Sequence, residues 1–165
     1  MIKKKMMITL NTEQSDYVEL SANSPIPMVE SEREDEIEHE KTELFTEGTL
    51  EISRDGKFVL SYDESKLTNA PFSITSVHFE KSNHNLVTLM RTGEFRLAMV
   101  FEPDTRHICV YETPYMPIEM CIATHSLKNT LSERGGCLRV RYSIETNGMR
   151  CEMARIDLVV QPQED

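Results

Sequence analysis

The stretch that decides the fold runs from residue 48 to residue 62 and reads GTLEISRDGKFVLSY. On both sides of Arg54-Asp55-Gly56, apolar side chains stand at every second position, which is the period of a half-buried β-strand. A three-residue loop that ends in glycine supplies the left-handed backbone position of a bulged hairpin turn. Such a turn predicts that Ile52 lies opposite Phe58, with the apolar side chains of both strands on one face. The stretch therefore predicts an antiparallel hairpin.

Period two continues along the chain beyond this hairpin, and turn residues separate the apolar runs. Thr92-Gly93 predicts a two-residue loop with Met90 opposite Phe95. Pro114-Tyr115-Met116 marks another turn, because proline fits only at a turn or at a strand end. The strands predicted most clearly are 48–53, 57–62, 94–102 and 138–145.

Asn147-Gly148 is a type I′ turn signal and joins the run at 138–145 to the last apolar run, 151–160. Up to Met153, the last run matches the apolar face of its partner. Beyond that residue, the apolar side chains alternate on the other parity. We therefore expect a β-bulge near Ala154 or a strand that changes face.

One short helix is predicted over residues 127–133. Ser126 is a suitable N-cap and Gly135 a suitable C-terminal stop. Leu127 and Leu131 are spaced so that they lie on one face of a helix.

Strands are also predicted near the start of the chain. Met6–Leu10 predicts an opening strand, and residues 37–46 are predicted as a strand because like-charge pairs such as Glu34 and Glu38 disfavour a helix. A chain with so many sequential hairpins usually closes on itself and so hides its edges. We therefore predict one domain over residues 1–165, an all-β, mostly antiparallel, closed or nearly closed β-barrel of about 8–10 strands with one short helix.

Charge is concentrated in one segment of the chain. There are 18 Lys+Arg and 28 Asp+Glu, a net charge of −10, and nine of the acidic residues stand with two basic ones between Glu30 and Glu47. We expect an exposed, solvated segment at about 22–43, with an acidic arm for a basic partner or for divalent ions as the alternative. Because the sequence offers no compensating stripe of Lys and Arg, nucleic acid is not expected as a partner.

The protein is predicted to be cytoplasmic. The apolar stretch after Lys3-Lys4-Lys5 is short, so neither a signal peptide nor a membrane span is expected. The four cysteines form no CxxC motif, which argues against a disulfide framework and favours a reducing compartment.

Seven short motifs follow one another over residues 46–160. They are Thr46-Glu47-Gly48, Leu60-Ser61-Tyr62-Asp63-Glu64, Arg91-Thr92-Gly93-Glu94, Met99-Val100-Phe101-Glu102, Tyr111-Glu112-Thr113-Pro114-Tyr115, Gly135-Gly136 and Leu138-Arg139-Val140-Arg141-Tyr142. In order and spacing they resemble the YwiB-like domains, bacterial β-barrels of the calycin (lipocalin-like) type whose function is uncharacterised. The sequence departs from that family at Met116, where a turn glycine is expected. The resemblance implies a barrel and supplies no activity.

Four side chains that commonly bind metals fall on one predicted hairpin. If the strands around Pro114 pair with Cys109 opposite Cys121, then His107 and His125 share their face. The two histidines belong to different rungs of the sheet, too far apart for one tetrahedral zinc site with bonds of roughly 2.0–2.3 Å. We therefore expect no metal and no cofactor.

The sequence contains no recognisable catalytic motif. A nucleophile elbow, an HExxH helix, a Walker loop and a dinucleotide fingerprint are all missing. Asp63 and Glu64 are neighbours on a strand, so they point to opposite faces and cannot form an acid–base pair with each other. We therefore do not expect an enzyme.

Strand parity points to polar and aromatic side chains at the mouth of the barrel. Tyr62 and Glu64 share the parity of the apolar Leu60 and are assigned to the inner face. Glu64 and Arg91 are expected at the mouth, either as a buried ion pair or as anchors for a ligand. The candidate ligand-binding residues, at the mouth or on the lining, are Tyr62, Glu64, Arg91, Phe101, Tyr111 and Tyr142.

Methionine is the residue type that best lines an adaptable cavity, and Met90, Met99, Met120 and Met153 fall on predicted inner faces. We therefore expect a barrel that holds a small apolar or amphipathic ligand, in a protein that is a monomer or a homodimer. The alternative is a filled barrel that acts through its outer surface as an interaction or assembly module. A cavity of roughly 300 Å³ or more favours the ligand, and a core packed to a density of about 0.74 favours the surface role.

Overall fold

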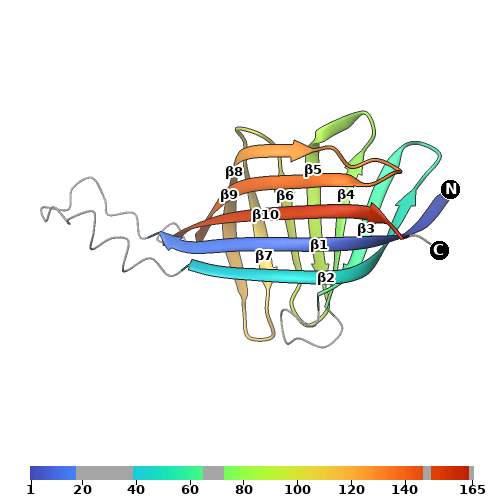
Figure 1. Cartoon of the computed structure of the whole chain (residues 1–165). Helices are drawn as coiled ribbons and strands as arrows, with labels where there is room; N and C mark the ends of the chain where they lie inside the picture. The colour runs from blue at the N-terminus through green and yellow to red at the C-terminus, as the bar shows by residue number, and fades with distance from the viewer. Residues whose placement is uncertain (18–38, 65–72, 147–149, 164–165) are drawn as a thin grey trace, which may run out of the picture.

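The computed structural model describes residues 1–17, 39–64, 73–146 and 150–163. Within these ranges the chain forms ten strands. They are β1 Ile2–Tyr17, β2 His39–Ile52, β3 Lys57–Asp63, β4 Ile74–Glu80, β5 Asn83–Thr92, β6 Leu97–Phe101, β7 Arg106–Glu112, β8 Pro117–Asn129, β9 Gly136–Thr146 and β10 Arg150–Pro162 (Figure 1). No helix in these ranges is long and apolar enough to cross a bilayer.

The strands form one antiparallel meander that curls into a barrel (Figure 1). Strand β1 pairs with both β2 and β10, so the order in the sheet is β6-β5-β4-β3-β2-β1-β10-β9-β8-β7. The outermost strands, β6 and β7, meet at one bridge, where the backbones of Arg96 and Glu112 exchange hydrogen bonds of 2.9 and 2.8 Å. The barrel is therefore nearly closed, and the predicted all-β architecture is confirmed.

Alternate residues of each strand point into the barrel and form its core. Burial follows this alternation in β3 and β4, where every second residue is enclosed. The largest fully buried side chains include Phe101, Met6, Ile8, Leu60, Ile122, Leu138 and Leu158. Phe58 stacks on Phe79, with ring centroids 4.8 Å apart, and it pairs with Ile52, which pairs with Ile2 at the start of β1.

The hairpin around Arg54-Asp55-Gly56 has the predicted register. Ile52 pairs with Phe58, and Leu50 pairs with Leu60. The glycine has a φ of 87°, the left-handed conformation that the three-residue loop requires.

The predicted hairpin at Thr92-Gly93 has a longer loop and a different register. Met90 pairs with Ala98 and not with Phe95, so β6 is shorter than the predicted strand 94–102. A type I′ turn needs positive φ at both central residues. Of the two only the glycine has a positive φ, 134°, because this conformation is strained for the β-branched threonine. The predicted register is therefore wrong, and Met90 points outward with 38% of its surface exposed.

The predicted helix over residues 127–133 is wrong, since these residues form no helix. Leu127 lies in β8 and pairs with Val140 of β9, so the apolar contact across the sheet outweighs the weak local preference for a helix. Gly135 does not end a helix. It closes a tight turn with Ser132, through backbone hydrogen bonds of 2.8 and 3.0 Å.

The last hairpin, β9–β10, is a regular ladder, and the bulge expected near Ala154 does not form. Residues 147–149 separate the two strands, one residue more than a two-residue turn contains, and the extra residue reverses the parity of the last strand. Ala154 is therefore buried in the barrel, and Met153 belongs to the outer face. In this part of the sheet, the register shifts in β8 instead, between Thr124 and Ser126.

The predicted strand at 37–46 is confirmed where it is described, because β2 begins at His39 and pairs with β1. Part of the acidic segment predicted at 22–43 is therefore regular strand. The remainder, 22–38, lies outside the described residues.

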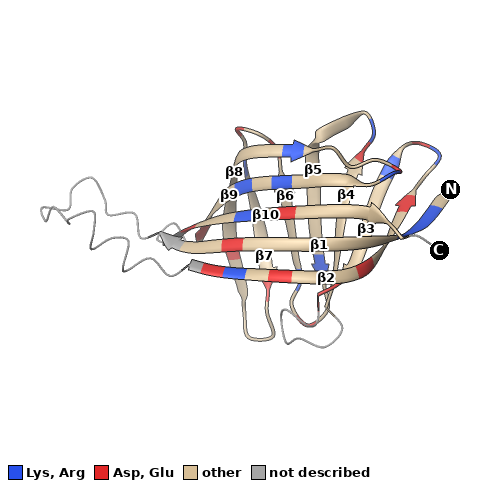
Figure 2. Ribbon diagram, in the orientation of Figure 1, with Lys and Arg blue, Asp and Glu red and all other residues tan. Residues whose placement is uncertain are grey.

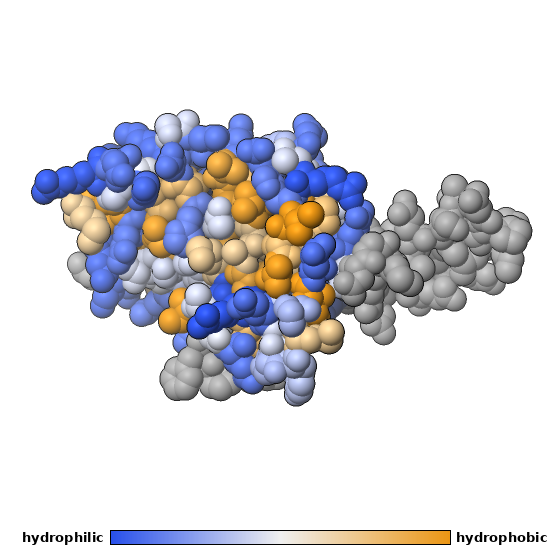
Figure 3. Space-filling model, turned by 180° about the vertical axis from the view of Figure 1, so that it is seen from behind, coloured by the Kyte–Doolittle hydropathy of each residue, from blue (hydrophilic) through white to orange (hydrophobic). Residues whose placement is uncertain are grey.

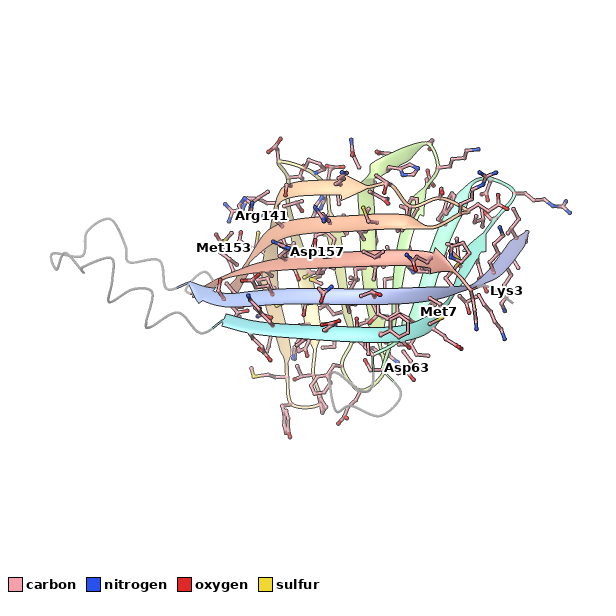
Figure 4. The ribbon with its side chains drawn as sticks, viewed as in Figure 1. Lys3, Met7, Asp63, Arg141, Met153 and Asp157 are labelled. Atoms are coloured by element: carbon pink, nitrogen blue, oxygen red, sulfur yellow. The ribbon has the colours of Figure 1, made fainter. Side chains whose placement is uncertain are left out.

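Residues of both charge signs are interspersed along the strands (Figure 2), and some of them form ion pairs on the outer face of the barrel. Arg155 Nη2 lies 2.6 Å from Asp157 Oδ2, and Arg106 Nη2 lies 2.6 Å from Glu145 Oε2. The neighbouring strands β9 and β10 carry Arg141 and Asp157 on this face (Figure 4). Exposed ion pairs contribute only about 0–1 kcal/mol each. The stability of the fold therefore rests on the interior of the barrel.

Candidate functional site

A cavity of about 470 Å³ lies inside the barrel, toward the end away from the two termini (Figure 1). Because neighbouring strands are antiparallel, this end is built from the second halves of the odd-numbered strands and the first halves of β6, β8 and β10. The apolar part of the wall consists of Leu10, Leu89, Leu97, Met99, Ile118, Met120, Ile144 and Ile156.

One inner rung of the sheet brings polar side chains into this apolar wall. Across β3, β4, β5 and β6, its paired residues are Tyr62, Thr75, Arg91 and Leu97. Glu64 follows β3, and its backbone N–H donates to the Ser73 carbonyl at 3.0 Å. Because the inward side chains here are only those of Thr75 in β4 and of Ser73 just before it, Arg91 can reach across β4 to Glu64.

Arg91 and Glu64 form an enclosed ion pair. Arg91 Nη2 donates a hydrogen bond of 2.7 Å to Glu64 Oε2, and the two side chains are 25% and 4% exposed. The pair neutralises two charges in a place where an isolated charge would be costly. Of the two arrangements expected from the sequence, the structure has the pair. The pair leaves some hydrogen-bonding capacity unused, because Thr75 Oγ1 and Arg91 Nε are enclosed and have no partner in the described ranges.

Two buried tyrosines complete this group. Burial, together with the charge of Glu64 and a hydrogen bond to it, raises the pKa of the Tyr62 phenol well above its usual range. Burial also raises the pKa of the Tyr142 phenol, although Arg91 acts in the opposite direction. Both phenols are therefore protonated at neutral pH. Tyr62, Glu64, Arg91 and Tyr142 are called the polar cluster below.

The rim of the cavity is also polar and aromatic. The half-buried Tyr111 stacks on Phe95, with ring centroids 6.0 Å apart. On the side of β1 and β10, the amide of Gln14 donates a hydrogen bond to the Glu152 carboxylate. A ligand entering from this end would meet aromatic and polar groups before the apolar wall.

The structure brings five of the six candidate residues to the cavity wall. These are Tyr62, Glu64, Arg91, Tyr111 and Tyr142. The sixth, Phe101, is fully buried and packs on the Tyr142 ring, with centroids 4.8 Å apart. Phe101 therefore supports the wall from behind and does not line it.

Of the four methionines predicted on inner faces, two line the cavity and two do not. Met99 and Met120 line the cavity, as expected. Met90 and Met153 do not, because the registers of their hairpins differ from the predicted ones.

Sequence reasoning missed the contribution of the first and last strands to the rim. Gln14 was missed because it lies beyond the predicted opening strand. Glu152 was missed because a two-residue turn at Asn147-Gly148 assigns Met153 to the inner face in its place. The signal that finds Glu152 is the run of alternating apolar residues from Ala154 to Val160, whose parity it shares.

The hairpin with the four possible metal ligands is offset by one residue from its predicted register. Cys109 pairs with Met120, and Cys121 pairs with Ile108, so the two cysteines lie on opposite faces. Burial raises the pKa of the Cys109 thiol to about 11. Over the described part of the chain, no three His, Cys, Asp or Glu side chains are grouped so that they could hold a metal ion.

Comparison with known proteins agrees with this barrel. The crystal structure of the YwiB protein from Bacillus subtilis matches with a TM-score of 0.64 and 17% sequence identity, over 97% of this chain and 94% of that one. At that identity the match shows a shared fold. No curated protein matches the chain. A family model described as a domain of unknown function, DUF1934, matches residues 28–158. The chain therefore belongs to the DUF1934 family, the YwiB-like β-barrels that its motifs resemble.

Proposed function

We propose that the protein binds a small apolar or amphipathic molecule inside its barrel. The observation that carries this proposal is the cavity of about 470 Å³, which lies within the range of about 300–1,000 Å³ that is usual for small-molecule sites. Its wall combines apolar side chains with polar groups that can orient a ligand, as such sites usually do.

The chemistry of the polar cluster favours binding over catalysis. A general acid or base works best when its pKa lies near the operating pH. Burial moves the pKa values of the Tyr62 and Tyr142 phenols away from neutrality. Glu64 is held by Arg91. We therefore propose that the protein is a binding protein rather than an enzyme. We also propose that it acts in the cytoplasm, because Cys109, Cys121 and Cys137 are free thiols.

The test is to fill the cavity with a larger side chain. Ala154 is buried on the cavity wall, so Ala154→Phe places a phenyl ring in the space that a ligand needs. Ala98→Phe is the matched control, because Ala98 is exposed on β6. Binding is measured with N-phenyl-1-naphthylamine, an uncharged dye that fluoresces in apolar surroundings.

The unmodified protein should bind one dye molecule per chain. Ala98→Phe should bind it equally well, and Ala154→Phe should bind it at least about tenfold more weakly, a loss of about 1.4 kcal/mol. Thermal unfolding shows whether both variants are folded. Binding that is absent from the unmodified protein, or equal in the two variants, would contradict the proposal.

A second candidate function is association of two copies through the outer face of β6 and β7. Ile108 and Val110 are 72% and 47% exposed, and apolar surface gathers on this side of the molecule (Figure 3). Ala98 and Val100 of β6 face outward nearby. For a chain with a net charge of −10, an uncharged patch is where two copies repel each other least. Analytical ultracentrifugation should then give a dimer that Ile108→Lys dissociates, and a monomer at every concentration would contradict this candidate.

A further inference from the structure

We propose that the polar cluster selects ligands whose head group is an uncharged hydrogen-bond acceptor, such as the carbonyl of a ketone, ester or amide, over ionised ligands of equal length. This inference rests on the proposed function, because it concerns which molecule the cavity holds.

The charges of the cluster oppose an ionised head group of either sign. Glu64 and Arg91 are joined by a hydrogen bond of 2.7 Å, so a carboxylate placed beside Arg91 also lies beside Glu64. An ammonium group placed beside Glu64 likewise lies beside Arg91. Either ion would lose its water of hydration on entering the cavity and would gain little net attraction beside the pair. An uncharged group avoids that desolvation cost.

The hydrogen-bonding groups of the cluster favour an acceptor. An arginine side chain has five N–H donors and no acceptor, and Arg91 uses one of them on Glu64. Tyr142 lines the same cavity, and the structure shows no protein hydrogen bond to its hydroxyl in the described ranges. Arg91 and Glu64 line this cavity together with Tyr142. A carbonyl oxygen, with two lone pairs, can accept from the Tyr142 hydroxyl and from Arg91 together.

The unmet hydrogen bonds of the cluster point the same way. Thr75 Oγ1 and Arg91 Nε are both enclosed without a partner in the described part of the barrel. A buried polar group that lacks a partner costs about 1–3 kcal/mol. Of these two residues, Arg91 lines the cavity and Thr75 does not, so the acceptor of a ligand would bond to the Arg91 guanidinium.

The apolar part of the ligand then has a defined environment. Leu89 and Leu97 flank Arg91 along the wall formed by β5 and β6, and Ile144 and Ile156 come from β9 and β10. An unbranched alkyl chain attached to the acceptor is the simplest molecule that satisfies both parts of the cavity.

The test uses three probes with the same ten-carbon length, 2-decanone, decanoate and decylammonium. Each displaces N-phenyl-1-naphthylamine from the unmodified protein at neutral pH. The ketone should displace the dye at a concentration at least about tenfold lower than either ion. Tyr142→Phe should weaken ketone binding by about three- to tenfold, the effect of one neutral hydrogen bond, and should weaken binding of the dye by less than that. Tyr115→Phe is the matched control and should bind the ketone normally, because Tyr115 is 92% exposed and does not line the cavity.

A second variant tests the charge argument directly. Glu64→Gln removes the carboxylate that opposes an anion and leaves the positive charge of Arg91. This variant should bind decanoate more tightly than the unmodified protein does, and the preference for the ketone should shrink or reverse. An unchanged ranking in Glu64→Gln would mean that the pair does not control selectivity.

The outcomes separate this inference from the proposed function. If the dye binds but either ion displaces it as readily as the ketone, the inference is wrong and the cavity still binds ligands. If Tyr142→Phe and Tyr115→Phe weaken ketone binding equally, the polar cluster has no special role. If neither the dye nor any of the three probes binds, the proposed function is refuted together with the inference. Should Tyr142→Phe fail to fold, the ranking of the three probes on the unmodified protein decides the question.

Discussion

Removing either Glu64 or Arg91 alone should strongly lower the free energy of unfolding. Removing both should cost less than the sum of the two single losses. Glu64→Gln leaves a guanidinium group without its carboxylate, and Arg91→Leu leaves a carboxylate that is only 4% exposed. Breaking a buried ion pair from one side costs about 3–5 kcal/mol, because the remaining charge is desolvated and uncompensated.

The two single substitutions should differ in size. A quarter of the Arg91 side chain is exposed, so water can solvate part of the guanidinium that Glu64→Gln leaves behind. We expect that substitution to lower the free energy of unfolding by about 2–3 kcal/mol, and Arg91→Leu to lower it by about 3–5 kcal/mol. The double variant contains neither charge. Its loss should therefore be smaller than the sum of the single losses by about 1–3 kcal/mol, the usual coupling between residues in contact.

Urea unfolding followed by far-ultraviolet circular dichroism measures all four free energies. The dependence on urea should have the same slope in each variant if only native-state stability changes. The exposed pair of Lys3 and Glu51, with an N–O distance of 3.7 Å, provides a matched control cycle. Its coupling should stay below about 1 kcal/mol.

Additive losses would refute this reasoning. If both single substitutions cost less than about 0.5 kcal/mol, the level of an ordinary surface change, the two side chains are not inside the barrel in solution. Large but additive losses would mean that each residue is held by other neighbours and that the hydrogen bond between them contributes little.

Three further predictions concern titration and packing. Because burial raises the pKa of Tyr62 and Tyr142 above 10.0, the stability they contribute is complete below that pH and is lost as the pH rises through their folded-state values. Phenolate absorbance should therefore show two tyrosines that ionise only as the barrel unfolds, and changing both to phenylalanine should remove this late component. Burial lowers the pKa of His78 below 6.5, so the unfolded chain binds more protons and stability should fall as the pH drops through the folded-state value. Urea midpoints of His78→Gln should depend less on pH over that range, and an equal dependence would contradict the assignment. A Cβ at Gly48 would lie 2.7 Å from the Ser61 carbonyl oxygen, so Gly48→Ala should lower the free energy of unfolding by about 1–3 kcal/mol in the same urea assay, and no loss would show that the strands can separate there.

Much of the fold could be predicted because it depends on short-range pattern. The loop Arg54-Asp55-Gly56 contains its own turn signal, and the two strands beside it have apolar residues on only one parity. Turn geometry and burial therefore agree on one register, and Ile52 pairs with Phe58 as predicted. The same local consistency makes the chain recognisable as an antiparallel barrel.

The predicted strand registers were wrong where a turn could have more than one length. The loops after Thr92, after Glu112 and after Thr146 all differ from the simplest choice, and each shift moves the partner of every residue in that hairpin. A shift by one residue also exchanges the two faces of a strand. This is why Met153 was assigned to the inside in place of Ala154.

The helix prediction failed for a different reason. Leu127 and Leu131 have helical spacing, but a short isolated helix gains little stability in water. Pairing of Leu127 with Val140 buries apolar surface in the sheet, and sequence spacing does not contain that contact.

By itself, the sequence determined the alternation of strands and turns. It also determined which polar residues, among them Glu64 and Arg91, stand at positions where the alternation otherwise places apolar side chains. Only the tertiary structure decided that these two side chains meet, because β4 lies between β3 and β5, and the small side chains of Thr75 and of Ser73 just before it leave enough space. It also decided that the barrel closes through Arg96 and Glu112 and that one end remains hollow. Period and turn chemistry act over a few neighbouring residues, whereas closure and cavity volume depend on how all the strands pack together.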